Sequence, residues 1–257
     1  MLITTSVKEQ LRRIAVSNIH IYAFARKAVR RLPFMLPHEP DFHGLKLLAN
    51  ESDTFLDIGA NDGLSALSLR YLCPKKPILS IEPNPVHEQE LAALKSRMAG
   101  FDYRICGAGR TADTLTLHTP QLNGYALTNY TSFSPEAVAA NLEYHMRIRG
   151  IGEKVKMLTH TVEVVPIDTL GLTTDLIKID VEGAEDAVLN GLVETIGRCR
   201  PAAMVEYNVL SHDAVSAFFQ ARDYVCRRYD PAKRLFAPVD DGFPLNLFWF
   251  PNERVGS

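Results

Sequence analysis

The sequence has few cysteines, and their spacing does not suggest a bound metal or a disulfide framework. Four occur in 257 residues, they lie far apart, and they form no CxxC pair or cysteine–histidine cluster. This argues against a disulfide-stabilised scaffold and against a structural zinc site. We therefore expect reduced, mostly buried thiols in a cytoplasmic protein. The four are Cys73, Cys106, Cys199 and Cys226.

An excess of charge and a long apolar run are also lacking. The 28 basic and 30 acidic residues give a formal net charge of −2, so nothing attracts the whole chain to nucleic acid. The longest uncharged run near the N-terminus, residues 14–25, is too short to span a bilayer. Asn18 and His20 within it weaken a likeness to a signal peptide. No internal repeat or low-complexity tract is present.

Residues 1–48 are predicted to form an N-terminal helical extension and a proline-containing linker. Residues 7–32 contain no Gly or Pro, and their basic side chains border a mostly apolar middle. This helix either packs on the domain with a solvated basic face or contacts an acidic lipid surface or a partner. Three prolines between residues 33 and 40 indicate the linker, and residues 43–50 a short helix.

Residues 49–257 are predicted to form one α/β domain. Apolar runs alternate with helical patterns, which favours a parallel sheet covered by helices on both faces. A polar and aromatic stretch at about 119–152 interrupts the alternation, and insertions of this length are often functional. The expected strands are 55–57, 78–82, 103–106, 176–180, 202–206, 224–228 and 245–250, the last as a hairpin edge. The expected helices are 64–71, 86–98, 187–196 and 214–222, and around the insertion we expect strands at 114–118 and 160–165 and a helix at 135–147.

The stretch TFLDIGANDG, residues 54–63, joins a strand to a helix through a glycine-bounded turn. Such a turn directs backbone N–H groups and a helix dipole towards a ligand. The next apolar run ends in Glu82, and an acid at this place suits the hydroxyls of a ribose. Together they predict a nucleoside-containing cofactor across the carboxyl ends of two parallel strands.

The turn does not have the GxGxxG form of a dinucleotide-binding site. It reads GxNxG from Gly59 to Gly63, which argues against a nucleotide-sugar or NAD-dependent oxidoreductase. Asp57, two residues earlier, would repel a pyrophosphate and suits a cationic ligand. S-adenosylmethionine carries a sulfonium and an ammonium group beside a carboxylate, so an acid and backbone N–H groups could serve both ends of its methionine part.

Four predicted parallel strands end in, or just before, an acidic residue. The carboxyl ends of parallel strands line the ligand-binding edge of an open α/β sheet. Four acids there are stronger support for a site than any one alone, because they would converge on a single edge. They are Asp57, Glu82, Asp180 and Glu206.

Four sequence blocks in fixed order resemble the FkbM family of S-adenosylmethionine-dependent methyltransferases. They are DIGANDG, IEPNP (81–85), PIDTL (166–170) and IKIDVEGAE (177–185), within roughly residues 52–208. The resemblance implies a class I methyltransferase fold, which is Rossmann-like: a seven-stranded, mostly parallel sheet whose last strand is antiparallel. It also implies methyl transfer, usually to a hydroxyl of a sugar, glycolipid or secondary metabolite.

The resemblance further implies which residues bind the cofactor. The turn after the first strand would hold the methionine part, Glu82 the ribose, and the residues after the third strand the adenine. The implied set is Asp57, Gly59, Ala60, Asn61, Gly63, Glu82, Pro83, Asn84, Cys106, Gly107 and Ala108, with Asp180 facing the methyl group.

Methyl transfer to an alkyl hydroxyl needs an aligned acceptor and a base that takes its proton. Asp180 is the first candidate for that base, and its alternative role is to cap the helix that begins near Gly183. Glu206 could bind acceptor hydroxyls or, with Asp180, a divalent metal; two acids far apart in sequence define no ligand set, so no metal is predicted. His160 could supply a base or be a packed or solvated histidine. Lys178, inside a buried strand, is expected to snorkel or pair with an acid.

Three functions remain open at this point. The leading one is O-methylation of a small-molecule or glycan acceptor, and the others are N-methylation and a non-catalytic binding module on the same fold. The sequence does not indicate the oligomeric state.

Overall fold

The structure is a computed structural model that describes residues 37–50, 52–122, 124–149, 155–239 and 244–254. The predicted basic helix at 7–32 lies outside the described residues. The chain divides into two compact units. One consists of Leu36–Thr116 and His160–Ser257, and the other of Met1–Met35 and Leu117–Thr159.

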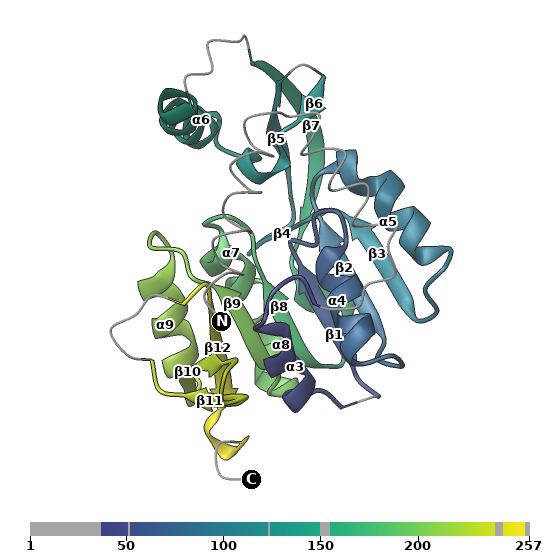
Figure 1. The fold of residues 1–257 in the computed structure, drawn as a ribbon, viewed down its shortest axis with the longest axis vertical. Helices are drawn as coiled ribbons and strands as arrows, with labels where there is room; N and C mark the ends of the chain where they lie inside the picture. Colours follow the sequence, from purple (N-terminus) through teal and green to yellow (C-terminus); the bar gives the residue numbers. More distant parts are fainter. Residues whose placement is uncertain (1–36, 51, 123, 150–154, 240–243, 255–257) are drawn as a thin grey trace. The chain divides into compact units, whose positions relative to one another are not determined.

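The larger unit is built on an eight-stranded sheet in the order β11-β10-β12-β9-β8-β1-β2-β3 (Figure 1). Neighbours from β9 to β3 pair in parallel. All seven expected strands are present, which confirms the mostly parallel class I methyltransferase architecture. The bounds are β1 Thr54–Ile58, β2 Ile78–Glu82, β3 Phe101–Ile105, β8 Thr174–Ile179, β9 Ala202–Glu206, β10 Tyr224–Asp230, β11 Leu235–Ala237 and β12 Asn246–Pro251.

The prediction that the last strand forms an edge is wrong. β12 lies between β9 and β10, antiparallel to both, and all six of its residues are buried. Its sequence NLFWFP is apolar on both faces, as a central strand requires. The edge is instead β11, which pairs antiparallel with β10 as a hairpin. The sequence prediction did not include this strand.

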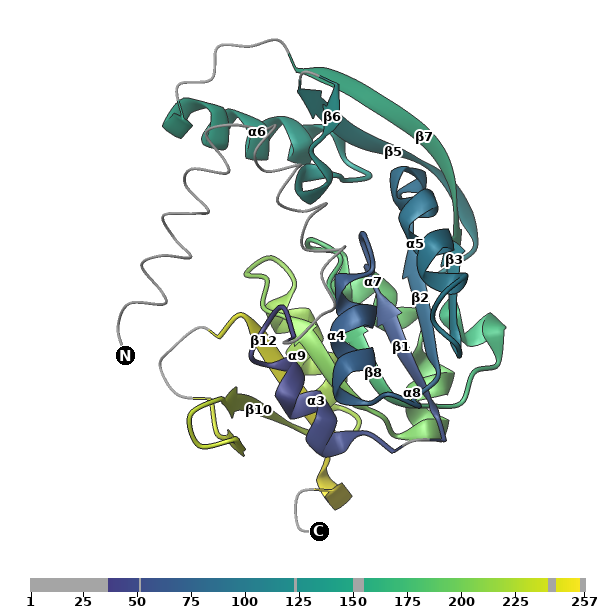
Figure 2. The ribbon, with the colours of Figure 1, turned by 45° about the vertical axis from the view of Figure 1, so that its right-hand side comes forward.

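Successive side chains of a strand point to opposite faces of the sheet, and they form two apolar clusters, one on each face. One cluster joins Phe55 and Phe248 to α3, α4 and α5, and the other joins Leu56 and Trp249 to α7, α8 and α9. Figure 2 shows α3 beside α4 against one face. The bounds are α3 Phe42–Leu48, α4 Leu64–Leu72, α5 Glu88–Lys95, α7 Glu185–Asn190, α8 Val193–Cys199 and α9 His212–Gln220.

The helix expected at 187–196 is two helices, α7 and α8, separated at Gly191. A Cβ on Gly191 would lie 2.1 Å from the carbonyl oxygen of Gly109, so only glycine permits this close approach. Asp168 fixes the start of α8, because its carboxylate accepts the backbone N–H groups of Glu194 and Thr195 at 2.9 and 2.8 Å. The expected helix at 86–98 is also shorter, with a 3₁₀ turn at Pro85–His87 before α5.

A second sheet contains β4 (Gly107–Ala108), β7 (Lys156–Val165), β5 (Asp113–Leu122) and β6 (Tyr125–Ala126), in that order. The strand expected at 114–118 lies within β5, which pairs antiparallel with β6 as a hairpin. The helix expected in the insertion is α6 (Pro135–Arg149). Short 3₁₀ turns lie at Thr128–Tyr130, Ile167–Leu170 and Asn252–Arg254. In the described part of the chain, no helix has both the length and the apolarity to cross a bilayer.

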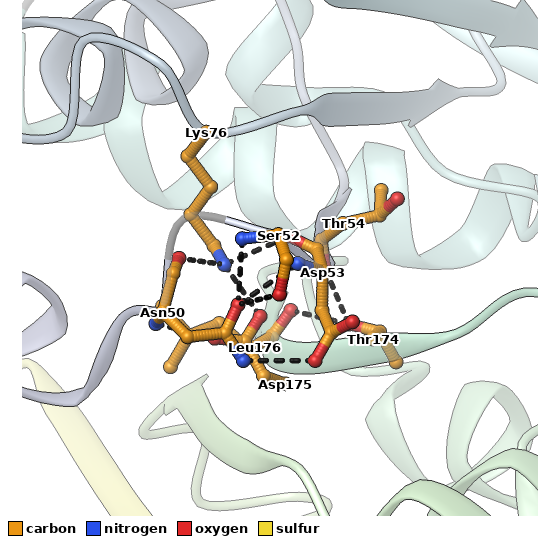
Figure 3. A network of polar contacts seen from close by, with 8 residues as sticks. All are labelled: Asn50, Ser52, Asp53, Thr54, Lys76, Thr174, Asp175 and Leu176. Carbon is orange, nitrogen blue, oxygen red and sulfur yellow. Dashed lines mark hydrogen bonds and ion pairs between the residues drawn. The ribbon is translucent and has the colours of Figure 1, made fainter.

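A buried ion pair joins Lys76, which lies just before β2, to Asp175 at the beginning of β8 (Figure 3). The ammonium group of Lys76 lies 2.5 Å from the carboxylate of Asp175 and donates to the carbonyl oxygens of Asn50 and Asp53 at 2.8 and 2.9 Å. Asp175 also accepts the backbone N–H of Asn50 at 2.8 Å. All three ammonium hydrogens are thus used, which offsets the cost of burying the charge.

Candidate active site at the carboxyl ends of the strands

The glycine turn after β1 folds back on the end of β2. The N–H groups of Gly59 and Ala60 donate to the carbonyl oxygen of Ile81 at 2.9 and 3.2 Å, and the N–H of Gly63 donates to Ala60 at 2.9 Å. The N–H of Asn61 donates to the carboxylate of Glu82 at 2.7 Å. These four N–H groups are satisfied within the protein. The structure therefore corrects the expectation that they point towards a ligand.

Two glycines are required by the path of this turn. Gly59 has φ +80°, and a Cβ there would lie 1.7 Å from the carbonyl oxygen of Asp180. Gly63 has φ +83°, and a Cβ there would lie 2.3 Å from Cδ1 of Leu94. Residues other than glycine rarely adopt such positive φ values. The backbone of the turn is consequently in direct contact with the end of β8.

Glu82 lies beside this turn, at the tip of β2. One carboxylate oxygen accepts the N–H of Asn61, and the other accepts the N–H of Asn84 at 2.8 Å. Each oxygen keeps a further lone pair that a hydroxyl could use. The residue is 6% exposed, and burial raises its pKa to about 7. Glu82 therefore has the position and the acceptor capacity expected of a ribose-binding carboxylate.

Asp57 lies deeper than the sequence suggested. Its carboxylate is fully buried, and Oδ2 accepts hydroxyl hydrogens from Ser65 and Ser80 at 2.6 and 2.9 Å. Oδ1 lies 3.9 Å from Nζ of Lys178 and accepts no hydrogen bond from any described residue. The carboxylate thus ties the end of β1 to β2, to α4 and to β8.

Lys178 is paired with acids, which confirms one of the two roles expected for it. Its Nζ lies 2.9 Å from Oδ2 of Asp180 as well as close to Asp57, and the residue is 3% exposed. Burial by itself would lower the pKa of Lys178, but the two carboxylates together raise it above its ordinary value.

The structure brings Asp180 and Glu206 together at the ends of β8 and β9, with their carboxyl groups hydrogen-bonded to each other. Burial and the nearby charge of Asp180 raise the pKa of Glu206 to about 9. Burial would also raise the pKa of Asp180, yet the ammonium group of Lys178 and the hydrogen bond from Glu206 lower it. At neutral pH the pair therefore holds one proton, on Glu206, and Asp180 is ionised.

The alternative role of Asp180 as a helix cap is wrong, because α7 begins at Glu185 and its N-cap residue is Ala184. Glu182 stands close to the pair: one carboxylate oxygen each from Asp180, Glu182 and Glu206 lie within 4.8 Å of one another. Burial and the charge of Asp180 raise the pKa of Glu182 to about 7. Acidic clusters of this kind also occur without an ion, and we assign no metal site to them.

The remaining predicted residues lie at the same edge or outside it. Asn84 is buried and its side chain accepts the N–H of Val86 at 3.2 Å. Cys106 is buried, which raises its pKa, and Gly107 and Ala108 pair with Val164 and Val165 of β7. His160 lies in β7, and its Nε2 is a buried atom with no hydrogen-bond partner among the described residues. No described contact joins His160 to Asp180 or Glu206.

Two supporting residues were missed by the sequence prediction. Ser80 stands opposite Asp57 in the register of β1 and β2, so a polar residue inside an apolar strand was a usable signal. His38 precedes α3, and its Nδ1 lies 2.7 Å from Oγ of Ser68. Burial and then the charge of Lys178 lower the pKa of His38 to about 4, so it is neutral at neutral pH. No motif marks His38 in the sequence.

Comparison with known proteins finds a matching family and similar sequences. The model of the Methyltransferase FkbM domain matches residues 57–228. Methyltransferase sdnD from Sordaria araneosa is 32% identical over 54% of this chain, and the match spans 60% of that relative.

Two solved structures are among those similar to this chain. The crystal structure of Methyltransferase FkbM from Methylobacillus flagellatus KT is 18% identical, with a TM-score of 0.50 over 82% of this chain and 50% of that one. The O-methyltransferase TomG from Streptomyces achromogenes, in complex with SAM, is 13% identical, with a TM-score of 0.43 over 89% of this chain and 88% of that one. Because the family model covers more than half of the sequence, with its four blocks in order on a class I sheet, the chain belongs to the FkbM methyltransferase family.

Proposed function

We propose that this protein transfers a methyl group from S-adenosylmethionine to a hydroxyl of a sugar, glycolipid or secondary metabolite. Membership of the FkbM family supports the reaction class. The observation that carries the proposal is the position of Glu82, whose carboxylate is bound to the glycine turn and retains acceptor capacity for the hydroxyls of a nucleoside.

The residues around Glu82 fit this cofactor. Glu82 would hold the ribose hydroxyls, the turn from Asp57 to Gly63 would receive the methionine part, and the segment from Cys106 to Ala108 would contact the adenine. The space at Gly59 and Gly63 is filled by neighbouring atoms of the protein, so these glycines serve the shape of the turn and not a cavity. When bound, S-adenosylmethionine supplies an electrophilic methyl group.

Asp180 acts as the base. It is ionised at neutral pH because Lys178 and Glu206 both favour its charged form, and it is partly exposed at the strand tip. An ionised carboxylate can accept the proton that the acceptor hydroxyl gives up as its oxygen forms the new bond to carbon. Glu206 keeps its proton and donates a hydrogen bond to Asp180, which orients that carboxylate.

The test has two steps. Calorimetry with S-adenosylhomocysteine is expected to show micromolar binding by the full chain. Incubation with radiolabelled S-adenosylmethionine and a panel of glycans and hydroxylated natural products is then expected to label at least one hydroxyl acceptor. The absence of a binding heat with S-adenosylhomocysteine would refute the proposal. Labelling confined to amines would replace O-methylation with N-methylation. Cofactor binding without labelling of any acceptor in the panel would favour a binding module.

A further inference from the structure

Lys178 is a charged residue of the site for which the chemistry above requires no contact with substrate or cofactor. It lies inside β8, a strand whose six residues are all buried. A buried ammonium group is costly unless it is paired and hydrogen-bonded. Its partners must therefore account for its presence, and both of them belong to the candidate active site.

The ammonium group of Lys178 connects two parts of the site. On one side it lies 2.9 Å from Oδ2 of Asp180, the proposed base. On the other it lies 3.9 Å from Oδ1 of Asp57, whose second oxygen is already held by two serines. Since the backbone at Gly59 is packed on the carbonyl of Asp180, the glycine turn after β1 and the proposed base are in contact as well. Lys178 thus fixes the base relative to the turn.

The surrounding charges make Lys178 decisive for which acid is ionised. The other ionisable groups that act on it or on its partner Asp180 lie on β2, on β9, in the turn after β8 and before α3. They are Glu82, Glu206, Glu182, Glu39 and His38. His38 is neutral at neutral pH and the others are acids, so none of these groups offers Asp180 a positive charge. Lys178 donates directly to Asp180, so the ionised form of Asp180 is favoured over that of Glu206.

We propose that Lys178 is a positioning residue for methyl transfer, which holds Asp180 ionised at the tip of β8 and leaves the shared proton on Glu206. The inference rests on the proposed function, because Lys178 acts on Asp180 and Asp180 is the base of the proposed reaction. It goes beyond that function in assigning the choice between the two acids to a residue that touches neither reactant.

The test measures the ionisation of the two acids directly. Carboxyl signals of ¹³C-labelled Asp and Glu are titrated by NMR in the wild type and in Lys178→Met, with Asp180→Asn and Glu206→Gln used to assign the signals. Loss of the ammonium group is expected to raise the titration midpoint of Asp180 by about 1–3 pH units, as removal of an opposite charge in contact does. The control is Lys95→Met, which removes an exposed ion pair with Asp102 and should leave both midpoints unchanged. Unchanged midpoints in a folded Lys178→Met protein would overturn the proposal.

A second measurement does not depend on the variant folding. In wild-type protein the ¹⁵Nζ signal of Lys178 is expected to remain that of an ammonium group at pH values above the ordinary lysine pKa. The Asp180→Asn substitution is expected to lower the titration midpoint of Lys178. A midpoint at or below the ordinary value in the wild type would refute the ion pairing on which the proposal depends.

Calorimetry separates this proposal from the proposed function. If wild-type protein binds S-adenosylhomocysteine and the carboxyl midpoints do not respond to Lys178→Met, the positioning role alone fails. If wild-type protein binds no S-adenosylhomocysteine, the enzymatic function fails and the role of Lys178 in methyl transfer fails with it.

Discussion

Burial raises the pKa of two glutamates at the strand tips, Glu82 and Glu206, to neutral pH or above it. Glu82 is nearly enclosed, and its two backbone donors only partly offset the burial that raises its pKa to about 7. Burial is also the largest cause at Glu206, and the nearby charge of Asp180 adds to it, so that the pKa of Glu206 rises to about 9. The first is suited to accept hydrogen bonds from a ligand, while the second is suited to donate one to its neighbour.

Replacing the carboxylate of Glu82 by an amide is expected to weaken cofactor binding. Glu82→Gln puts an amide NH₂ where an acceptor is needed, so one backbone N–H or one ribose hydroxyl loses its partner. A hydrogen bond to a charged group contributes about 1.5–3 kcal/mol, which corresponds to roughly a 10–100-fold loss of affinity for S-adenosylhomocysteine. Calorimetry measures the loss, and Glu88→Gln, on the exposed start of α5, is the matched control. Equal affinity in both variants would contradict the role of Glu82.

The stability of the protein is expected to fall as pH rises from about 5 to 9. The pKa of Glu206 in the folded chain, about 9, exceeds the ordinary glutamate value of 4.5, so the folded state binds more protons over this range. Its stabilising contribution is therefore complete below about 4.5 and is lost as pH rises through about 9. Glu82 and Glu182 act in the same direction up to about 7.

Urea unfolding at a series of pH values measures this slope. Glu206→Gln cannot titrate, so its unfolding free energy should depend less on pH between 7 and 9 than that of the wild type. Glu88→Gln should keep the wild-type slope. A wild-type slope in Glu206→Gln would show that Glu206 does not carry the extra proton.

At the scale of elements, the break between α7 and α8 depends on close backbone packing. Gly191→Ala would place a methyl group 2.1 Å from a carbonyl oxygen of Gly109, beside β4 and the residues expected at the adenine. Because the obstacle is backbone, we expect a loss of about 2–4 kcal/mol in the free energy of unfolding. Gly197→Ala in α8 is the control: nothing lies within 4 Å of its Cβ, and alanine should stabilise that helix by about 0.5–1 kcal/mol. Similar effects from both substitutions would refute the packing argument.

The same elements show what the sequence can predict. Runs such as ILSIE and LIKID carry both the strand and the acid that ends it, so the edge with Glu82, Asp180 and Glu206 was predictable from local pattern. The split at Gly191 was not, because it depends on Asp168 and Gly109, which are distant in sequence. The central place of β12 was missed because strand order is decided by packing on both faces, whereas the preceding glycine and proline indicated only a turn.

Within the site, contact partners were harder to predict than candidate residues. Asp57, Glu82, Asp180 and Glu206 were all named from the sequence, and the structure places each at the end of its strand. The burial of Asp57 and the shared proton between Asp180 and Glu206 depend on the neighbours that the fold supplies. His38 comes from a segment without any motif.

At the scale of the whole molecule, two kinds of ion pair should differ in their effect on stability. Lys76→Met leaves Asp175 buried without its counter-charge, and breaking a buried pair in this way costs about 3–5 kcal/mol. Lys95→Met removes an exposed pair with Asp102, for which about 0–1 kcal/mol is expected. Urea denaturation of both variants measures the contrast. A loss below about 1 kcal/mol in Lys76→Met would show that the network in Figure 3 contributes little.

The position of β12 has a consequence for how the polypeptide reaches this state. β9 and β10 are synthesised first, yet they do not pair with each other, because β12 lies between them. Until β12 leaves the ribosome, β9 and β10 therefore each have an unpaired edge with which strands of other chains could pair. Nascent chains arrested before residue 246 should thus need a chaperone to stay monomeric, whereas chains released from the ribosome with β12 should not.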